Sequence, residues 1–164
     1  MIRKHKNYAK PRKAYDKSRI NEEAKIKEKF GLKNKREIWK AEAKVALIRR
    51  RAKELITSSE DEKIHFFEKL QILGFRVQTI SDVLALTKDD ILQRRLQTIV
   101  HQKKLASSPK AARQMITHKK VLVNEKVINV PSYIVPIHLE QGISIKPMKM
   151  HVPHLPEAER EQKQ

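Results

Sequence analysis

The sequence predicts a mainly α-helical protein with a small α+β module near its carboxyl end. Apolar residues recur every three or four positions through most of residues 19–93, as they do on one face of an α-helix. Two runs of β-forming residues, at 121–123 and 127–130, flank a two-residue turn. Glycine, proline and helix-capping residues separate these periodic segments. A chain of 164 residues therefore has room for one or two small domains.

Two helices are expected in the first third of the chain. Ser18 is a plausible N-cap for the first, and Gly31 can end it. Asn34 can cap a longer helix, with Glu37 three residues on in a variant of the capping box. Trp39 is expected to be a core aromatic beside the apolar stripe of this second helix. That stripe consists of Ile38, Ala41, Val45, Ile48, Ala52 and Leu55.

Further helical segments are expected up to residue 104. Ser59 and Glu62 form a possible capping box for a helix that ends at Gly74, and residues 82–86 suggest a short helical turn. Thr87 and Asp90 then start a helix that continues through residues 88–104. The neighbouring carboxylates of Asp89 and Asp90 are not expected to be catalytic, because acidic residues are favoured in the first turn of any helix.

The α+β module is expected to begin with a helix and continue into a β-hairpin. Ser108 can cap the helix, with Pro109 at its first position and an end near Thr117; Ala111, Ala112, Met115 and Ile116 form its buried side. A turn at residues 124–125 places Val123 opposite Lys126, Leu122 opposite Val127 and Val121 opposite Ile128. Residues 142–145 are a candidate for a last short strand.

Positive charge dominates the chain and is unevenly distributed. The formal charge is +18, made up of +13 in residues 1–58, −3 in residues 59–93, +8 in residues 94–146 and zero in residues 147–164. A surplus of this size indicates a polyanionic partner, because each phosphate neutralised by Lys or Arg releases condensed counterions. Two basic blocks around an acidic one favour two contact surfaces on one nucleic acid. Residues 1–18 are interpreted as a basic, extended arm; the alternative for the isolated protein is a disordered, solvated tail, and such arms commonly order on binding RNA.

Several other classes of function are disfavoured. The chain contains no cysteine, which removes disulfides and cysteine-bound zinc. No apolar run is long enough to span a membrane, and no long basic helix has a wide aromatic face, so no membrane partner is expected. His151 and His154 could bind a metal through two imidazoles, but without cysteine and with prolines beside them a flexible tail is the preferred interpretation. We expect no metal, cofactor, small-molecule substrate or catalytic residues.

Several motifs, in the same order along the chain, resemble the archaeal and eukaryotic form of the universal small-subunit ribosomal protein S-four family. They are "KPRKAYDKSRI" at 10–20, "FGLKNKREIWKAEA" at 30–43, "RRLQTIV" at 94–100, "ARQMITH" at 112–118 and "VNEKVINVPSYIV" at 123–135. The resemblance spans roughly residues 8 to 145. It implies a basic arm (1–18), a helical domain (19–93), an S-four-like RNA-binding domain (94–146) and a carboxyl-terminal tail (147–164).

The resemblance also implies a role and a set of RNA-facing residues. The role is that of a structural protein of the small ribosomal subunit, which binds ribosomal RNA early in assembly and helps to shape the messenger entry side. The implied partners are small-subunit ribosomal RNA, neighbouring small-subunit proteins and possible contact with mRNA, on cytoplasmic ribosomes. The matching RNA-facing positions are Lys33, Asn34, Lys35, Arg36, Arg94, Arg95, Arg113, Gln114, His118 and Asn124.

Charge alone adds further candidates for RNA contact. They lie in the arm, near the end of the second helix and around the α+β module: Arg3, Lys4, Lys6, Arg12, Lys13, Arg49, Arg50, Arg51, Lys103, Lys104, Lys119, Lys120 and Lys126. Three consecutive arginines cannot share one helix face, so phosphate contact is expected for at least two of residues 49–51.

The chain departs from the family pattern at three glycines, and two other functions remain as alternatives. Lys104, Lys119 and Glu125 stand where the family usually has glycine. A ribosome-assembly factor built on the same domains, acting on precursor ribosomal RNA, is the main alternative. An RNA-modifying enzyme with an S-four-like domain is disfavoured because the chain leaves no room for a catalytic domain of the usual size.

Overall fold

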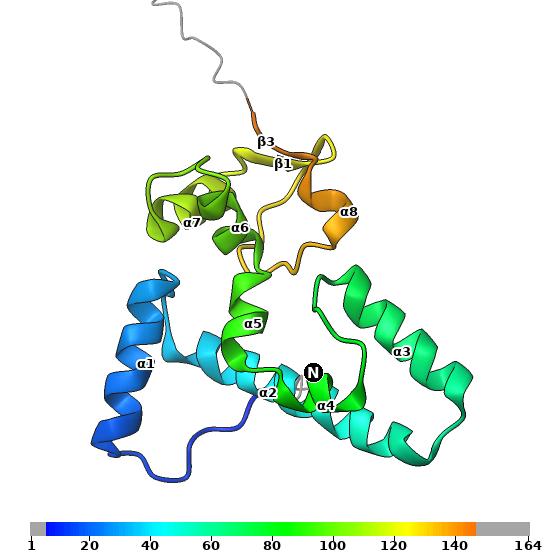
Figure 1. The fold of residues 1–164 in the computed structure, drawn as a ribbon. Coiled ribbons are helices and arrows are strands. Elements are labelled where there is room, and N and C mark those ends of the chain that lie inside the picture. The colour runs from blue at the N-terminus through cyan, green and yellow to red at the C-terminus, as the bar shows by residue number, and fades with distance from the viewer. Residues whose placement is uncertain (1–5, 147–164) are drawn as a thin grey trace, which may run out of the picture.

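The computed structural model describes residues 6–146, which form a helical half and a smaller α+β half (Figure 1). The helical half contains α1 (Lys17–Lys29), α2 (Lys35–Glu54), a 3-10 turn (Leu55–Thr57), α3 (Glu60–Ile72), α4 (Ile80–Ala85) and α5 (Lys88–Gln93). The α+β half contains α6 (Leu96–Gln102), α7 (Pro109–Thr117), β1 (Val121–Val123), β2 (Lys126–Val127), α8 (Ile137–Glu140) and β3 (Ile143–Ile145). The predicted fold class is confirmed.

Each half has its own apolar core. The first core is built on α2, and the predicted stripe of that helix is buried at every position except Ile48, which is partly buried. Trp39 packs against the same core, as expected. In Figure 1, α1 and α3 lie on opposite sides of α2, and α5 leads from α2 to the second half. The second core lies between α6, α7 and β1, around Ile99, Ile116 and Val121.

One predicted helix start needs correction, and two predicted starts are confirmed without the expected capping bonds. Helix α1 begins at Lys17, and the carboxylate of Asp16, rather than Ser18, accepts the backbone N–H groups of residues 18 and 19. Asn34 and Ser59 occupy N-cap positions, but neither side chain makes a capping hydrogen bond. A capping box that the sequence analysis missed joins Thr79 to Asp82. The predicted start at Thr87 is confirmed, with Asp90 accepting from the Thr87 N–H at 2.7 Å.

The single helix predicted through residues 88–104 is wrong, because the chain breaks between α5 and α6. Arg94 ends α5, and Arg95 has an extended backbone with ψ of 143°. At this break Arg95 bridges to Ile134, and the Leu96 N–H donates to the Tyr133 carbonyl at 2.7 Å. The backbone groups released from the helix are therefore satisfied by the segment that precedes α8, and the break joins the two halves.

The β-hairpin has the predicted register and carries a third strand. Leu122 pairs with Val127 and Val123 with Lys126, as expected, although β2 is only two residues long. The predicted last strand, β3, pairs antiparallel with the other edge of β1, which gives the order β2-β1-β3. Helix α8 was not predicted.

The three positions without the family glycine keep a left-handed backbone. Lys104 and Lys119 each follow the C-cap of a helix and have φ of 58°. At the end of α7, the N–H groups of residues 119 and 120 return to the carbonyls of residues 116 and 115, a Schellman motif that requires this conformation. Asn124 and Glu125 have φ of 47° and 67°, as a type I′ hairpin turn demands.

Residues 6–16 form no helix or strand but are tied to the helical half. The ring of Tyr8 lies 6.0 Å from that of Trp39, centroid to centroid. The Arg19 guanidinium donates to the carbonyls of Lys13 and Ala14 at 2.7 and 3.0 Å. The described part of the arm, residues 6–16, thus lies against the fold. Arg3 and Lys4, two further residues of the predicted arm, lie outside the described residues.

The substitution Lys119→Gly should raise the free energy of unfolding by about 1 kcal/mol, because glycine adopts positive φ without the steric penalty of a side chain. Urea denaturation followed by circular dichroism measures the change. Lys120→Gly is the matched control: Lys120 is equally exposed and its φ is not positive, so glycine there should destabilise the protein. Equal effects of the two substitutions would contradict the prediction.

Candidate nucleic-acid interface

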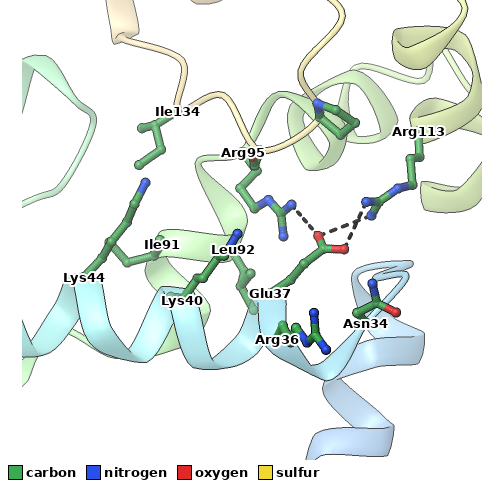
Figure 2. A pocket seen from close by; sticks show the side chains of 13 residues that line it. Asn34, Arg36, Glu37, Lys40, Lys44, Ile91, Leu92, Arg95, Arg113 and Ile134 are labelled. Carbon is green, nitrogen blue, oxygen red and sulfur yellow. Dashed lines mark hydrogen bonds and ion pairs between the residues drawn. The ribbon is translucent and has the colours of Figure 1, made fainter. Parts of the chain in front are cut away.

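A single carboxylate joins the two halves. Glu37, in the first turn of α2, receives hydrogen bonds from Arg95, at the α5–α6 break, and from Arg113 of α7 (Figure 2). The Glu37 oxygens lie 2.5 Å from the Arg95 guanidinium and 2.9 and 3.2 Å from that of Arg113. The side chains are 16%, 7% and 24% exposed, respectively, so the cluster is largely shielded from water.

These contacts explain why the predicted capping role of Glu37 is not observed. One of its oxygens does accept the Lys33 N–H at 3.2 Å, one residue before the N-cap, but the carboxylate is directed mainly to the two arginines. Burial by itself raises the pKa of Glu37, but hydrogen bonds and charge from Arg113 and Arg95 outweigh it and hold the pKa below its ordinary value of 4.5. Glu37 is therefore ionised and shared between the halves at neutral pH.

Gln97 provides a second, buried link next to this cluster. Its amide nitrogen donates to the carbonyls of Phe30 and Gly31, each at 3.0 Å, and of Pro109 at 2.9 Å, while its oxygen accepts from Arg113 at 3.3 Å. A side chain at Gly31 would place its Cβ 2.8 Å from that of Pro109. Glycine at residue 31 thus lets the end of α1 approach the start of α7.

Arg94 forms a third link on the other side of the break. Its guanidinium donates to the Leu73 carbonyl at 3.1 Å, to the Val135 carbonyl at 2.8 Å and to the Glu140 carboxylate at 3.0 Å. These partners come from the end of α3, from the segment before α8 and from α8 itself. The adjacent arginines 94 and 95 therefore hold the two halves together.

Several arginines that the sequence analysis expected to face RNA have partners within the chain. Arg94, Arg95 and Arg113 were predicted to face RNA, but their guanidinium groups have intramolecular partners, and Arg95 is buried. Arg49 is also partly buried and donates to the Leu86 carbonyl at 2.7 Å. Adjacent arginines in a sequence suggest contact with phosphate. The same guanidinium groups can instead donate to a buried carboxylate or to a backbone carbonyl within the protein. We leave Arg95 and Arg94 out of the proposed RNA surface.

A basic groove of about 400 Å³ lies where the two halves meet (Figure 2). One wall is formed by the exposed face of α2, with Arg36, Lys40 and Lys44. The other wall includes Arg95, Arg113 and residues 131, 132 and 134. Glu37 is the only acidic residue among its lining residues in the described part of the chain. We call this cavity the basic groove.

Lys40 and Lys44 were missed in the sequence analysis, although a signal was present. With Arg36 they recur at every fourth position, so that one face of α2 next to the apolar stripe carries three cations. Burial and the neighbouring charges of Arg95 and Lys40 lower the pKa of Lys44 from its ordinary value of 10.5. Like charges gathered in this way favour an anionic ligand that would relieve their repulsion.

A second cationic surface, the basic corner, lies between α7 and the hairpin. It consists of His118, Lys119, Lys120 and Lys126, all exposed. Within residues 6–146 none of these side chains forms an ion pair. Two further candidates, Gln114 and Lys104, are also exposed. Left-handed backbone at residue 119 directs the chain from the helix into β1, which brings these cations to one corner.

Two other predicted residues of this half have structural contacts. The ammonium group of Lys103 donates a hydrogen bond to the Glu140 carbonyl. Asn124 is exposed, but its side-chain oxygen lies where a side chain at Gly142 would be, so the turn packs closely on the start of β3. The Asn124 N–H also donates to the Gly142 carbonyl at 3.0 Å.

The candidates in the helical half divide in the same way. Lys33, Asn34 and Arg36 are exposed, as are Lys6, Arg12 and Lys13 of the arm. Lys35 pairs with the buried Glu23 at 3.2 Å. Arg50 and Arg51 are exposed on the last turns of α2 and each lies 3.3 Å from a Glu54 oxygen. Exposed pairs of this kind are weak, so both arginines can exchange Glu54 for phosphate.

Glu23 organises the start of the helical half. It accepts from Arg19 at 2.8 Å and from the Trp39 indole at 3.0 Å. Burial raises the pKa of Glu23, but the hydrogen bonds from Trp39, Lys35 and Arg19 together lower it below 4.5. Lys35 therefore contributes to the fold as well as to surface charge.

Two specific kinds of site were sought among the described residues, a metal cluster and a membrane-spanning helix. In residues 6–146, no three histidine or acidic side chains are placed to hold a metal ion. None of the helices in this range is long and apolar enough to cross a membrane. The pair His151 and His154 and the tail 147–164 lie outside the described residues.

Comparison with known proteins defines first the class of protein. The model of the S4 domain matches residues 94–140, which form most of the α+β half. The chain is thus an S4-domain protein with a helical half before this domain.

The family follows from relatives that match most of the chain. Small ribosomal subunit protein uS4 of Methanococcus aeolicus is 44% identical over 149 residues, which cover 87% of this chain and 84% of the relative. The uS4 protein of Thermoplasma volcanium is 43% identical, over 85% of this chain and 74% of the relative. The uS4 protein of Methanothermobacter thermautotrophicus is 38% identical, over 94% of this chain and 95% of the relative. The chain belongs to the uS4 family of ribosomal proteins, as the motifs suggested, and this family is not one of enzymes.

Removing the shared carboxylate should loosen the junction between the halves. Glu37→Gln leaves Arg95 and Arg113 without their counter-charge, and we expect a loss of about 3 kcal/mol in the free energy of unfolding. Urea denaturation measures the loss. Glu22→Gln, at an exposed position of α1, is the control and should change stability little. A loss no larger for Glu37→Gln than for this control would show that the cluster does not stabilise the fold.

The lowered pKa values of Glu37 and Glu23 predict acid sensitivity. Their stabilising contribution is complete above the unfolded-state pKa near 4.5 and is lost as the pH falls through the lower folded-state values. The free energy of unfolding should therefore decrease below about pH 4.5, and less steeply in Glu37→Gln. Denaturation curves at a series of pH values test this, and an identical pH dependence in the variant would contradict it.

Proposed function

We propose that this protein is a structural constituent of the small ribosomal subunit and binds small-subunit ribosomal RNA. The basic corner carries the proposal: His118, Lys119, Lys120 and Lys126 are exposed in the S4 domain and have no ion-pair partner in the described structure. Relatives that match nearly the whole chain are named as small ribosomal subunit proteins. We infer a location on ribosomes in the cytoplasm.

The geometry suits recognition of a folded RNA by shape and backbone. Basic side chains on a helix–hairpin junction can approach phosphates on adjacent strands, while Gln114 and Asn34 can bridge sugars or base edges. Rigid placement reduces the conformational entropy lost on binding. Backbone hydrogen bonds hold the helix end at Lys119, whose exposed side chain remains available.

The basic groove supplies a second contact with the same RNA. Arg36, Lys40 and Lys44 project from one face of α2, and the groove that they line continues to the α+β half. A phosphate in this groove would contact the cations of α2 beside the junction of the two halves. Binding there would favour the arrangement that the Glu37 cluster holds, which fits a protein that binds early and organises RNA around a preformed surface. Contacts with neighbouring proteins and with mRNA near its entry side belong to this proposal.

Neutralising one cation in each surface should reduce the salt dependence of RNA binding. For Lys119→Gln and for Lys44→Gln, the slope of log K against log salt should fall by about one, and affinity for a small-subunit ribosomal RNA fragment should decrease. Filter binding over a range of KCl concentrations measures both quantities. Lys69→Gln removes an exposed cation from the acidic segment and serves as the control. A slope unchanged in Lys119→Gln would exclude this lysine as a phosphate contact.

Incorporation into ribosomal particles tests the role itself. An epitope-tagged protein should co-sediment with mature small subunits in a sucrose gradient. If it remains at the top of the gradient while small subunits sediment normally, the proposed role is wrong. Presence on precursor particles with absence from mature subunits would instead identify an assembly factor.

A further inference from the structure

The outer face of α3 combines negative charge with exposed apolar side chains. With 100° of rotation per residue, seven exposed residues fall on one side of this helix: Glu60, Asp61, Ile64, His65, Glu68, Gln71 and Ile72. We call this side the α3 face. It carries three carboxylates and no lysine or arginine, in a chain with a net charge of +18.

The two isoleucines of the α3 face are exposed to solvent. Ile64 is 54% exposed and Ile72 is 53% exposed. Together with the glutamates they alternate every fourth residue, as Glu60, Ile64, Glu68 and Ile72, so the face is a stripe in which acidic and apolar side chains follow one another. A surface helix normally needs only one apolar side, and α3 already has one, formed by Phe66, Phe67, Leu70 and Leu73 against the helical core.

The carboxylates of this face are available to a ligand. Lys63 pairs with Glu60 at 2.8 Å, but it reaches Glu60 from the inner side and is itself only 17% exposed. Glu68 has His65 at 3.5 Å, which is a cationic partner only when protonated. For Asp61, no ion pair is found within residues 6–146. The face therefore presents negative charge to solvent.

The position of α3 leaves this face open. Figure 1 shows α3 at the margin of the helical half, on the side of α2 opposite to α1. Of its thirteen residues, Leu70 is the one buried among those described. A helix with so little burial depends on few contacts, and a partner that covers its outer side would stabilise it.

We propose that the α3 face docks a lysine- and arginine-rich amphipathic helix of a neighbouring protein. Phosphate is a poor ligand, because three carboxylates would repel it and the isoleucines would gain nothing from it. A helix with cations and apolar residues at alternating four-residue intervals would pair with the carboxylates and bury Ile64 and Ile72 at once. That the neighbour belongs to the same ribosomal particle rests on the proposed function; the docking chemistry does not.

A designed peptide can test the chemistry directly. The probe is a helix-forming peptide of about 18 residues, five turns, with Lys and Leu alternating every fourth position on one face. A scrambled peptide of identical composition is the control. Fluorescence anisotropy with the full chain should show saturable binding of the probe, weakened by KCl, and much weaker binding of the scrambled peptide. Equal binding of the two peptides would overturn the proposal, because charge alone would then account for the binding.

Substitutions in the full chain locate the binding site. The double variants Ile64→Gln/Ile72→Gln and Glu60→Gln/Glu68→Gln should each weaken binding of the probe about tenfold or more. Val130→Gln/Ile137→Gln removes two exposed apolar side chains of the other half and should leave binding unchanged. Because all these positions are exposed, thermal unfolding should confirm that each variant folds. Wild-type binding by both α3 variants would overturn the proposal.

Two further measurements distinguish docking of a basic helix from self-association and from RNA binding. Sedimentation equilibrium of the free chain should show a monomer; a dimer that Ile64→Gln/Ile72→Gln abolishes would mean that a second copy occupies the face, against the proposal. The α3 variants should bind the ribosomal RNA fragment as the wild type does, and competition between RNA and the peptide would also overturn the proposal. If the chain binds the peptide but no RNA, the proposed function fails and the docking face stands.

A photo-cross-linking residue in place of His65 extends the test to the particle. This position is exposed on the α3 face. In purified small subunits, cross-linking to a Lys/Arg-rich helix of another protein, identified by mass spectrometry, would support the proposal. Cross-linking to RNA would overturn it.

Discussion

The carboxylate of Glu37 is the interaction on which the relative placement of the two halves depends. Glu37 lies in the first turn of α2. It accepts hydrogen bonds from Arg95, between α5 and α6, and from Arg113 of α7. A largely buried charge is costly without a partner of opposite sign, and Glu37 and Arg95 each provide that partner for the other. Gln97 and Arg94 add directional hydrogen bonds on either side, so the halves meet through polar contacts of defined geometry. Such contacts specify one orientation more narrowly than apolar packing does.

This junction also determines which cations remain for a polyanion. Arg94, Arg95 and Arg113 neutralise carboxylates or bind carbonyls, whereas Arg36, Lys40 and Lys44 remain along the open groove beside them. The fold therefore contains two populations of positive charge with different functions. One is paired and holds the surface in shape, and the other is free to contact phosphate. The acidic outer face of α3 lies apart from both populations, which fits a division of the surface between RNA and protein partners.

The left-handed positions show how the chain keeps its shape without glycine. Lys104, Lys119, Asn124 and Glu125 all have positive φ, although each has a side chain. Backbone hydrogen bonds of the helix ends and of the hairpin register impose this conformation, because shifting any of these residues out of it would break several bonds at once. The energy of the resulting backbone strain is small compared with that of the hydrogen bonds. The left-handed conformation of Lys119 places this residue in the basic corner.

Local and tertiary effects explain which features could be predicted from the sequence. Periodicity and capping residues determined the α2 stripe, the Ser108-Pro109 helix start and the hairpin register, because each depends on neighbours within a few residues. Family motifs likewise identified the family. The break at Arg94-Arg95 and the use of Glu37 as a link instead of a cap depend on groups up to 76 residues away in the chain. Charge alone cannot distinguish an arginine that meets such a group from one that meets solvent. The amino-acid sequence thus determined the elements, the charge and the family, while the tertiary structure decided which cations are buried and which are exposed, because burial depends on what packs against each side chain.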